Sequence, residues 1–295
     1  MKIPSVISSR AAAAPPHLWF VISAIFHYLG PSFAVLLFQH VGVLGVAWFR
    51  ITSAALIFAI WTKPWQTFRS ASRDVIVLLL LLGACLAVMN STFYLAIDRL
   101  PLSLVAAIEF VGTIAIALFG LRSRHNYMAL LLAIVGVFIL TDVRWSSDPL
   151  GLAFAVINGL LFMAYIVLGH RIAHHGAGEG VGRLGAAMAA AFIFVMPIGL
   201  SDAIAALPHP ALIFAGIGVG VSSSVIPYIC DQLAMSRLPR NSFALLLALL
   251  PATATIVGAI VLGQIPTLKD IIGILLVMAG VALHKPATSI PSDRV

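Results

Sequence analysis

Long apolar runs alternate with short polar breaks along the whole chain. A helix needs about 20 apolar residues to cross the roughly 30 Å hydrocarbon core of a bilayer. Runs of about this length are predicted at 18–38, 43–61, 75–97, 102–121, 127–141, 150–168, 184–200, 211–230, 243–262 and 271–284. Helices are favoured because backbone polar groups in lipid must bond within their own segment, and no run alternates like a barrel strand. The pattern predicts an all-α integral membrane protein with ten transmembrane helices.

Composition excludes a soluble protein and several kinds of partner. Of the 295 residues 61% are hydrophobic and 9% charged, against about a quarter charged in soluble domains. The net charge of +7 comes mainly from basic residues between the spans, so it does not indicate a nucleic-acid partner. Cys85 and Cys230 lie within apolar runs and are expected to pack as small hydrophobic residues. We predict no cofactor and no metal.

The distribution of lysine and arginine predicts the orientation. Basic residues at the chain ends and in alternate breaks fall on one side, and only Arg99, Arg144 and Lys269 fall on the other. The side that holds the positive charge faces the cytoplasm. Residues 1–16, which have no cleavage site after the first apolar run, and residues 287–295 are therefore predicted to be cytoplasmic tails.

The chain contains an internal repeat. The segment from Leu95 to Pro101 shares its leucine, alanine and Arg-Leu-Pro positions with residues 233–239, which lie 138 positions later. We divide the chain into two five-helix repeats, 17–143 and 144–286. Because five is odd, the second repeat enters the membrane from the opposite side. Inverted repeats are common in transporters, where the substrate site lies near the midplane and alternating access exchanges the conformations of the halves.

Two charged residues fall inside predicted spans. Glu109 is the eighth residue of its span, about 12 Å deep at 1.5 Å per residue, where an ionisable group costs about 2.5 to 3.5 kcal/mol. It could recognise a substrate amine or carry a proton; the alternative is a structural hydrogen bond between helices. Arg50 could reach Glu109 or a substrate carboxylate, or extend outward as an anchor.

Further polar and aromatic residues lie within the spans at helical spacing. Asn90 and Tyr94 share one helix face, and Asn158 and Tyr165 share another. We predict a binding site for amphipathic solutes. It comprises Glu109 and Arg50 together with His27, Tyr28, Asn90, Tyr94, Asn158, Tyr165 and Tyr228. Each could instead bond only to neighbouring helices.

Several other residues carry structural expectations. Gly30 and Pro31 should loosen the backbone beside His27. The residues Ser222 to Ser224, Pro227 and Tyr228 suggest a kinked or hydrated helix, and Gly216 and Gly220 suggest close packing. Three acids at span ends are expected to be hydrated at the interface: Asp98, Asp142 and Asp231.

The sequence resembles the drug/metabolite transporter superfamily over nearly its whole length. It is similar in particular to the EamA-type permeases and their bacterial threonine/homoserine exporter branch. The resemblance rests on loose motifs in a fairly specific order: Phe49-Arg50-Ile51, NSTFYLAIDRLP at 90–101, Ile108-Glu109-Phe110, NGLLFMAYIVLGHR at 158–171, and Ser236-Arg237-Leu238-Pro239. Members often have Glu-Pro in the fourth and ninth helices. Here Thr113 replaces the first proline and Leu250 the second acid, so symmetric acids are absent.

The resemblance implies a secondary transporter of the bacterial inner membrane that exports amino acids or related metabolites, with Glu109 and Arg50 at its site. Protons are a candidate coupling ion, membrane lipids surround the protein, and the oligomeric state stays open. Export of other amphipathic metabolites or drugs is one alternative. A membrane-embedded enzyme is another, although its nearest candidates, His174 and His175, have no further ligand set. A receptor should carry a soluble domain, which the short loops do not provide.

Overall fold

The protein is described by a computed structural model, which covers residues 14–109, 123–141, 148–173, 177–238, 243, 246 and 249–283. Helices make up most of these residues, and no strand occurs among them. Six helical segments are long and apolar enough to cross a membrane. They are α2 (Pro16–Val41), α3 (Val43–Thr62), α5 (Arg73–Ile97), α8 (Pro149–Ala173), α9 (Ala177–Ala206) and the continuous run of α10 (Pro210–Gly220), η1 (Val221–Val225) and α11 (Ile226–Met235). A multi-pass helical membrane protein is thereby confirmed.

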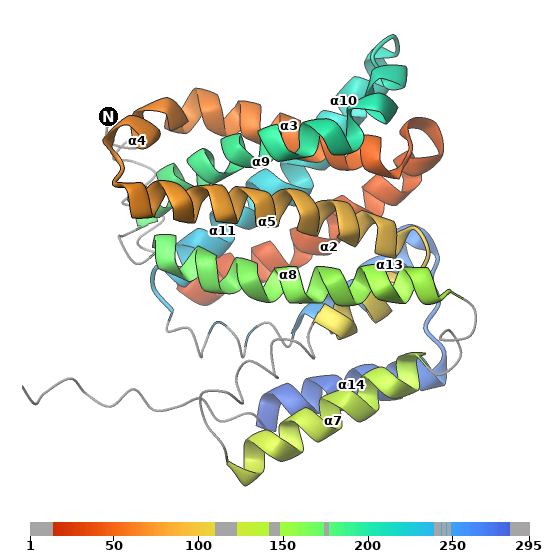
Figure 1. Cartoon of the computed structure of the whole chain (residues 1–295). Coiled ribbons are helices and arrows are strands. Elements are labelled where there is room, and N and C mark those ends of the chain that lie inside the picture. The colour runs from red at the N-terminus through yellow and green to blue at the C-terminus, as the bar shows by residue number, and fades with distance from the viewer. Residues whose placement is uncertain are drawn as a thin grey trace, which may run out of the picture.

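The remaining elements are shorter. Helix α4 (Pro64–Ser70) follows α3, and residues 102–109 begin the predicted fourth span, the rest of which lies outside the described residues. Helix α13 (Leu249–Leu262) is apolar but short, and α7 (Arg124–Thr141) lies beside α14 (Leu268–Leu283) at the bottom of Figure 1. Most of both tails also lies outside the described residues. The count of ten spans and the orientation therefore stay predictions.

Large apolar side chains cover the outside of the bundle. Ile60, Phe214 and Ile265 are among the most exposed, at 81%, 74% and 85%. A soluble monomer rarely presents so much contiguous apolar surface to water. This surface fits contact with acyl chains.

Helix α9 is longer than its sequence predicted. The apolar run indicated 184–200, but the helix extends from Ala177 to Ala206. Two glycines within the apolar run allow close packing. A Cβ at Gly185 would lie 2.0 Å from Thr62 Oγ1, and one at Gly199 would lie 2.1 Å from the Leu44 carbonyl oxygen. Helices α3 and α9 therefore approach each other backbone to backbone.

The predicted irregularity after α10 is confirmed. Residues Val221–Val225 form a π-helical turn, a feature that often marks functional sites. Gly216 packs against Phe49, and a Cβ at Gly220 would meet Ser53 and the Arg50 carbonyl oxygen. The close packing expected of both glycines is therefore present. Helix α2, by contrast, continues through Gly30 and Pro31 without a break. Because Gly30 has no Cβ, α2 can contact η1 at Ser223.

Asp148 caps the start of α8. Its Oδ1 accepts a 2.8 Å bond from the Gly151 N–H, and Arg99 Nη1 lies 3.3 Å from its Oδ2. The bond from Gly151 and the neighbouring arginine lower the pKa of this carboxyl below its usual value. The stabilisation is therefore present above the ordinary aspartate pKa and is lost as the pH falls through the lowered one.

We expect Asp148→Ala to lower the thermal stability of the purified protein at pH 7, because the α8 N-terminus loses its cap. Asp148→Asn should lower it less, since an asparagine oxygen can still accept the Gly151 N–H. Thermal unfolding in detergent at pH 7 and in acid would test this. The difference between Asp148→Ala and the unchanged protein should shrink in acid; a difference that persists there would contradict the role of the charged carboxylate.

Candidate functional site

Buried polar side chains gather in the interior, between α2, α3, α5, α8 and the η1–α11 run. All nine predicted site residues are buried there: Glu109, Arg50, His27, Tyr28, Asn90, Tyr94, Asn158, Tyr165 and Tyr228. They belong to segments far apart in sequence, and hydrogen bonds or ring contacts link them into three clusters. Their functional roles stay predictions.

The first cluster surrounds Glu109. This carboxylate is 2% exposed. Asn158 Nδ2 donates to its Oε1 at 2.5 Å, and the Tyr28 hydroxyl lies 3.3 Å from its Oε2. A Cβ at Gly159 would lie 3.4 Å from Glu109 Cα, an ordinary van der Waals distance, so α8 lies directly beside Glu109. Glu109 therefore faces the bundle interior, between α2 and α8, and not the acyl chains.

The second cluster surrounds Arg50. Its Nε donates to Ser224 Oγ at 2.9 Å, and its Nη2 donates to the Ser223 carbonyl oxygen at 2.8 Å. The guanidinium carbon lies 5.1 Å from the centre of the Tyr94 ring, within cation–π range. Arg50 is 2% exposed, so the interpretation as an outward anchor is wrong. Its Nη1 is buried and has no acceptor among the described residues.

Two bonds join α5 to the η1–α11 run beside Arg50. Tyr228 donates its hydroxyl to Asn90 Oδ1 at 3.0 Å, and Tyr94 bonds to Ser223 Oγ at 3.4 Å. The predicted shared face of Asn90 and Tyr94 thus points inward. Its partners come from the other predicted repeat.

The third cluster corrects the sequence interpretation of Asp231. An interfacial, hydrated side chain was predicted, but Asp231 is 5% exposed. Ser23 Oγ donates to Oδ1 at 2.5 Å, and the Tyr165 hydroxyl donates to Oδ2 at 2.8 Å. The apolar run ended at Cys230, whereas α11 continues to Met235 and turns Asp231 inward. Asp231 follows Tyr228 by three residues and shares its helix face, but the exposed Asp98 follows Tyr94 by four, so this spacing alone was not a signal of burial.

Of the other two acids placed at the interface, Asp98 is exposed as predicted, and Asp142 lies outside the described residues. His174 and His175, on which the enzyme alternative depended, also lie outside them.

A small enclosed cavity lies beside Asp231. It holds about 10 Å³, and its lining includes His27, Phe162, Tyr165 and Asp231. The His27 ring meets the rings of Tyr28 and Phe162 edge-on, at 5.3 and 5.7 Å between centres. This volume has room for about one water molecule. Helices α2, α8 and α11 therefore leave almost no open space around Asp231.

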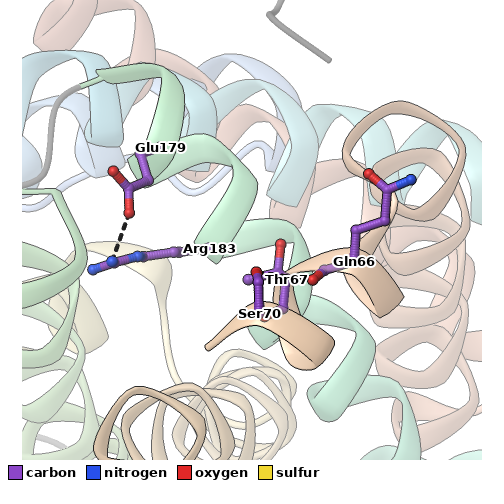
Figure 2. A network of polar contacts seen from close by, with 5 residues as sticks. All are labelled: Gln66, Thr67, Ser70, Glu179 and Arg183. Atoms are coloured by element: carbon purple, nitrogen blue, oxygen red, sulfur yellow. Dashed lines mark hydrogen bonds and ion pairs between the residues drawn. The ribbon is translucent and has the colours of Figure 1, made fainter. Parts of the chain in front are cut away.

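A separate polar groove lies at the surface, between α4, the start of α5 and α9. Its volume is about 430 Å³. Figure 2 shows Arg183 bonded to Glu179 on α9, at 2.6 Å, across from Gln66, Thr67 and Ser70. The Glu179 side chain is 55% exposed. Glu179 is therefore a solvent-exposed carboxylate, and its substitution can serve as a control for substitution of the buried Glu109.

Apolar spans around a buried polar interior define the class of this protein as a multi-pass helical membrane protein. Residues 149–284 match the EamA-like transporter family. The chain is 36% identical over 255 residues to "Threonine/homoserine exporter RhtA" of Salmonella typhimurium, covering 85% of this chain and 84% of that one. It is 37% identical over 240 residues to the protein of the same name from Escherichia coli K12, covering 80% and 79%.

The chain therefore belongs to the EamA-like transporter family, which confirms the resemblance found in the sequence. A solved structure described as "Crystal structure of protein" aligns over 90% of this chain and 96% of its own, with a TM-score of 0.57 and 17% identity. At this identity the likeness concerns the fold alone.

Proposed function

We propose that the protein is a secondary transporter of the bacterial inner membrane that exports small amino acids similar to threonine and homoserine. The observation that carries this proposal is the pair of opposite charges in the interior. Glu109 is held between α2 and α8, and Arg50 is held against η1 with a buried N–H that has no acceptor among the described residues. The names of the two relatives support the substrate class.

An amino-acid zwitterion matches this charge pair. Arg50 and Glu109 lie close enough to interact electrostatically. A substrate carboxylate would accept from Nη1 of Arg50, which has no acceptor within the described part of the chain, and a substrate ammonium would face Glu109. Charge-assisted bonds of this kind are about twice as strong as neutral ones. Asn158 and Tyr28 position Glu109, while Ser223 and Ser224 position Arg50.

We further propose two inverted five-helix repeats, 17–143 and 144–286, that alternate access to this site. The bond between Tyr228 and Asn90 supports the repeat, because these residues are 138 positions apart, the same offset that relates the repeated Arg-Leu-Pro segments. Equivalent residues of two repeats touch only near the axis that relates them. Gly83 packs on α9 at Ala187 and Ala190 much as Gly220 packs on α3 at Arg50 and Ser53.

Alternating access explains why the site is closed in this structure. Glu109 and Arg50 are each 2% exposed, and the neighbouring cavity beside His27 and Tyr165 holds about one water molecule, whereas an amino acid is several times larger. Entry of substrate therefore requires α2 and α8 to move apart, which breaks the bonds that both helices make to Glu109.

Transport by purified protein tests the proposal. We expect proteoliposomes loaded with unlabelled threonine to take up labelled threonine by exchange, with homoserine competing. In cells, overexpression should give resistance to toxic concentrations of either amino acid. A correctly folded protein that exchanges no member of an amino-acid panel would refute the proposal. Resistance to unrelated drugs, without amino-acid exchange, would favour the other substrate class.

A further inference from the structure

Asp231 repeats the arrangement of Glu109 at a second place between the same two helices. Glu109 accepts from Tyr28 on α2 and Asn158 on α8. Asp231 accepts from Ser23 on α2 and Tyr165 on α8. Both carboxylates are almost fully buried. Two acids therefore bridge α2 and α8, the helices that must separate to admit a substrate.

Among the residues that the structure describes, no permanent cation pairs with Asp231. The titratable groups that face it are Tyr165 on α8, Tyr228 and Cys230 on its own helix, and His27 on α2 across the cavity. No lysine or arginine forms an ion pair with it within the described part of the chain. Arg50 interacts with Glu109 and His27 and bonds to η1. A buried carboxylate without a cation is costly, so the compensating charge must come from solution.

The hydrogen bonds around Asp231 can serve both its charged and its neutral form. In the charged form Ser23 and Tyr165 each donate to one carboxylate oxygen. Ser23 Oγ also lies 3.2 Å from the Pro227 carbonyl oxygen, which can accept its proton instead. When a proton binds Oδ1, that oxygen donates to Ser23 Oγ, and Ser23 turns its own O–H to Pro227. Every polar group stays bonded, so no unsatisfied group is left in the dry interior.

We propose that Asp231, with Ser23 and Tyr165, forms a proton-binding site separate from the Glu109 cluster, and that this site couples substrate export to proton entry. The inference rests on the proposed function. A proton fits better than a metal cation, because the cavity of about 10 Å³ is lined largely by aromatic and aliphatic side chains. Proton binding converts Oδ1 from acceptor to donor and removes the negative charge that holds Ser23 and Tyr165. Separation of α2 and α8 then costs less.

The experiment compares exchange with gradient-driven transport in proteoliposomes of the full chain. We expect an acidic interior to drive threonine accumulation by the unchanged protein. Asp231→Asn mimics the protonated side chain, since its Nδ2 can donate to Ser23. This variant should still exchange threonine, but its gradient-driven accumulation should fall at least tenfold, to the level without a pH gradient. Asp98→Asn, which alters an exposed acid at the end of α5, should accumulate threonine normally.

Each result bears on one of the two proposals. Accumulation by Asp231→Asn that still follows the pH gradient would overturn the proton site. So would accumulation by the unchanged protein that follows a sodium gradient and ignores pH. If the unchanged protein exchanges no amino acid, the proposed function fails first, and the coupling inference fails with it.

Ser23→Ala gives an independent test if Asp231→Asn does not fold. The charged carboxylate loses a donor, while the neutral form loses a weaker bond. The pH of half-maximal accumulation should therefore move upward, by about one unit. Ser23→Thr, which keeps the hydroxyl, should restore the original profile. A profile that Ser23→Ala leaves in place would contradict the inference, whereas a purely structural role predicts reduced protein yield without a shift.

Discussion

Glu109→Gln is expected to reduce threonine exchange at least tenfold while the protein still folds. Glutamine has nearly the same shape, and its carbonyl oxygen can accept from Asn158 as Glu109 does. What is lost is the negative charge that would face a substrate ammonium. A hydrogen bond to a charged group contributes about 1.5 to 3 kcal/mol, which corresponds to about ten- to a hundredfold in rate or affinity. Exchange of labelled threonine in proteoliposomes measures the effect.

Glu179→Gln is the matched control. It makes the same chemical change in a half-exposed side chain of the surface groove (Figure 2), whose partner Arg183 is 13% exposed. Glu179 belongs to none of the three buried clusters, so exchange should stay close to that of the unchanged protein. If Glu109→Gln exchanges threonine as well as Glu179→Gln does, Glu109 has a structural role only.

Gly199→Ala is expected to cause a large loss of thermal stability. A single added methyl would lie 2.1 Å from the Leu44 carbonyl oxygen and 2.9 Å from Trp48 Cβ. Because backbone atoms cannot rotate away, α3 and α9 must move apart. Overpacking of this kind costs about 1 to 3 kcal/mol, and we expect the melting temperature in detergent to fall by about 3 to 10 °C. Thermal unfolding followed by size-exclusion chromatography would measure it.

Gly182→Ala adds the same methyl to the same helix, where nothing lies within 4 Å of the added Cβ. Alanine is the better helix former, by up to about 1 kcal/mol. This variant should therefore melt at the same temperature or slightly higher. Equal losses at the two positions would mean that α9 does not pack on α3 as closely as described.

The two predictions concern two kinds of contact between helices. Close contacts such as that of Gly199 hold α3 against α9, and the carboxylates Glu109 and Asp231 hold α2 to α8 through polar groups. Apolar packing in a membrane cannot be released by a substrate, whereas a bond to a charged group can be exchanged for one to a ligand or a proton. We therefore expect α2 and α8 to move during transport and α3 and α9 to stay together.

The class of fold could be predicted from the amino-acid pattern alone. Apolar length is decisive in a bilayer, because an unbonded backbone is too costly there for any other structure. The pattern also located Glu109 and Arg50, since a charged residue in an apolar run is conspicuous. The ends of helices were less predictable: α9 begins at Ala177, before its apolar run, because polar residues can extend a helix beyond the hydrocarbon.

Which polar residues meet depends on how the helices pack in three dimensions. Asp231 follows the end of an apolar run, and nothing local distinguishes it from Asp98, which is exposed at the end of α5. The difference arises because Ser23 and Tyr165, on two other helices, lie opposite Asp231. Likewise, η1 decides that Arg50 turns inward, by presenting Ser223 and Ser224 to it. Partners from distant segments determine whether a polar group is buried or hydrated, and local periodicity carries no information about them.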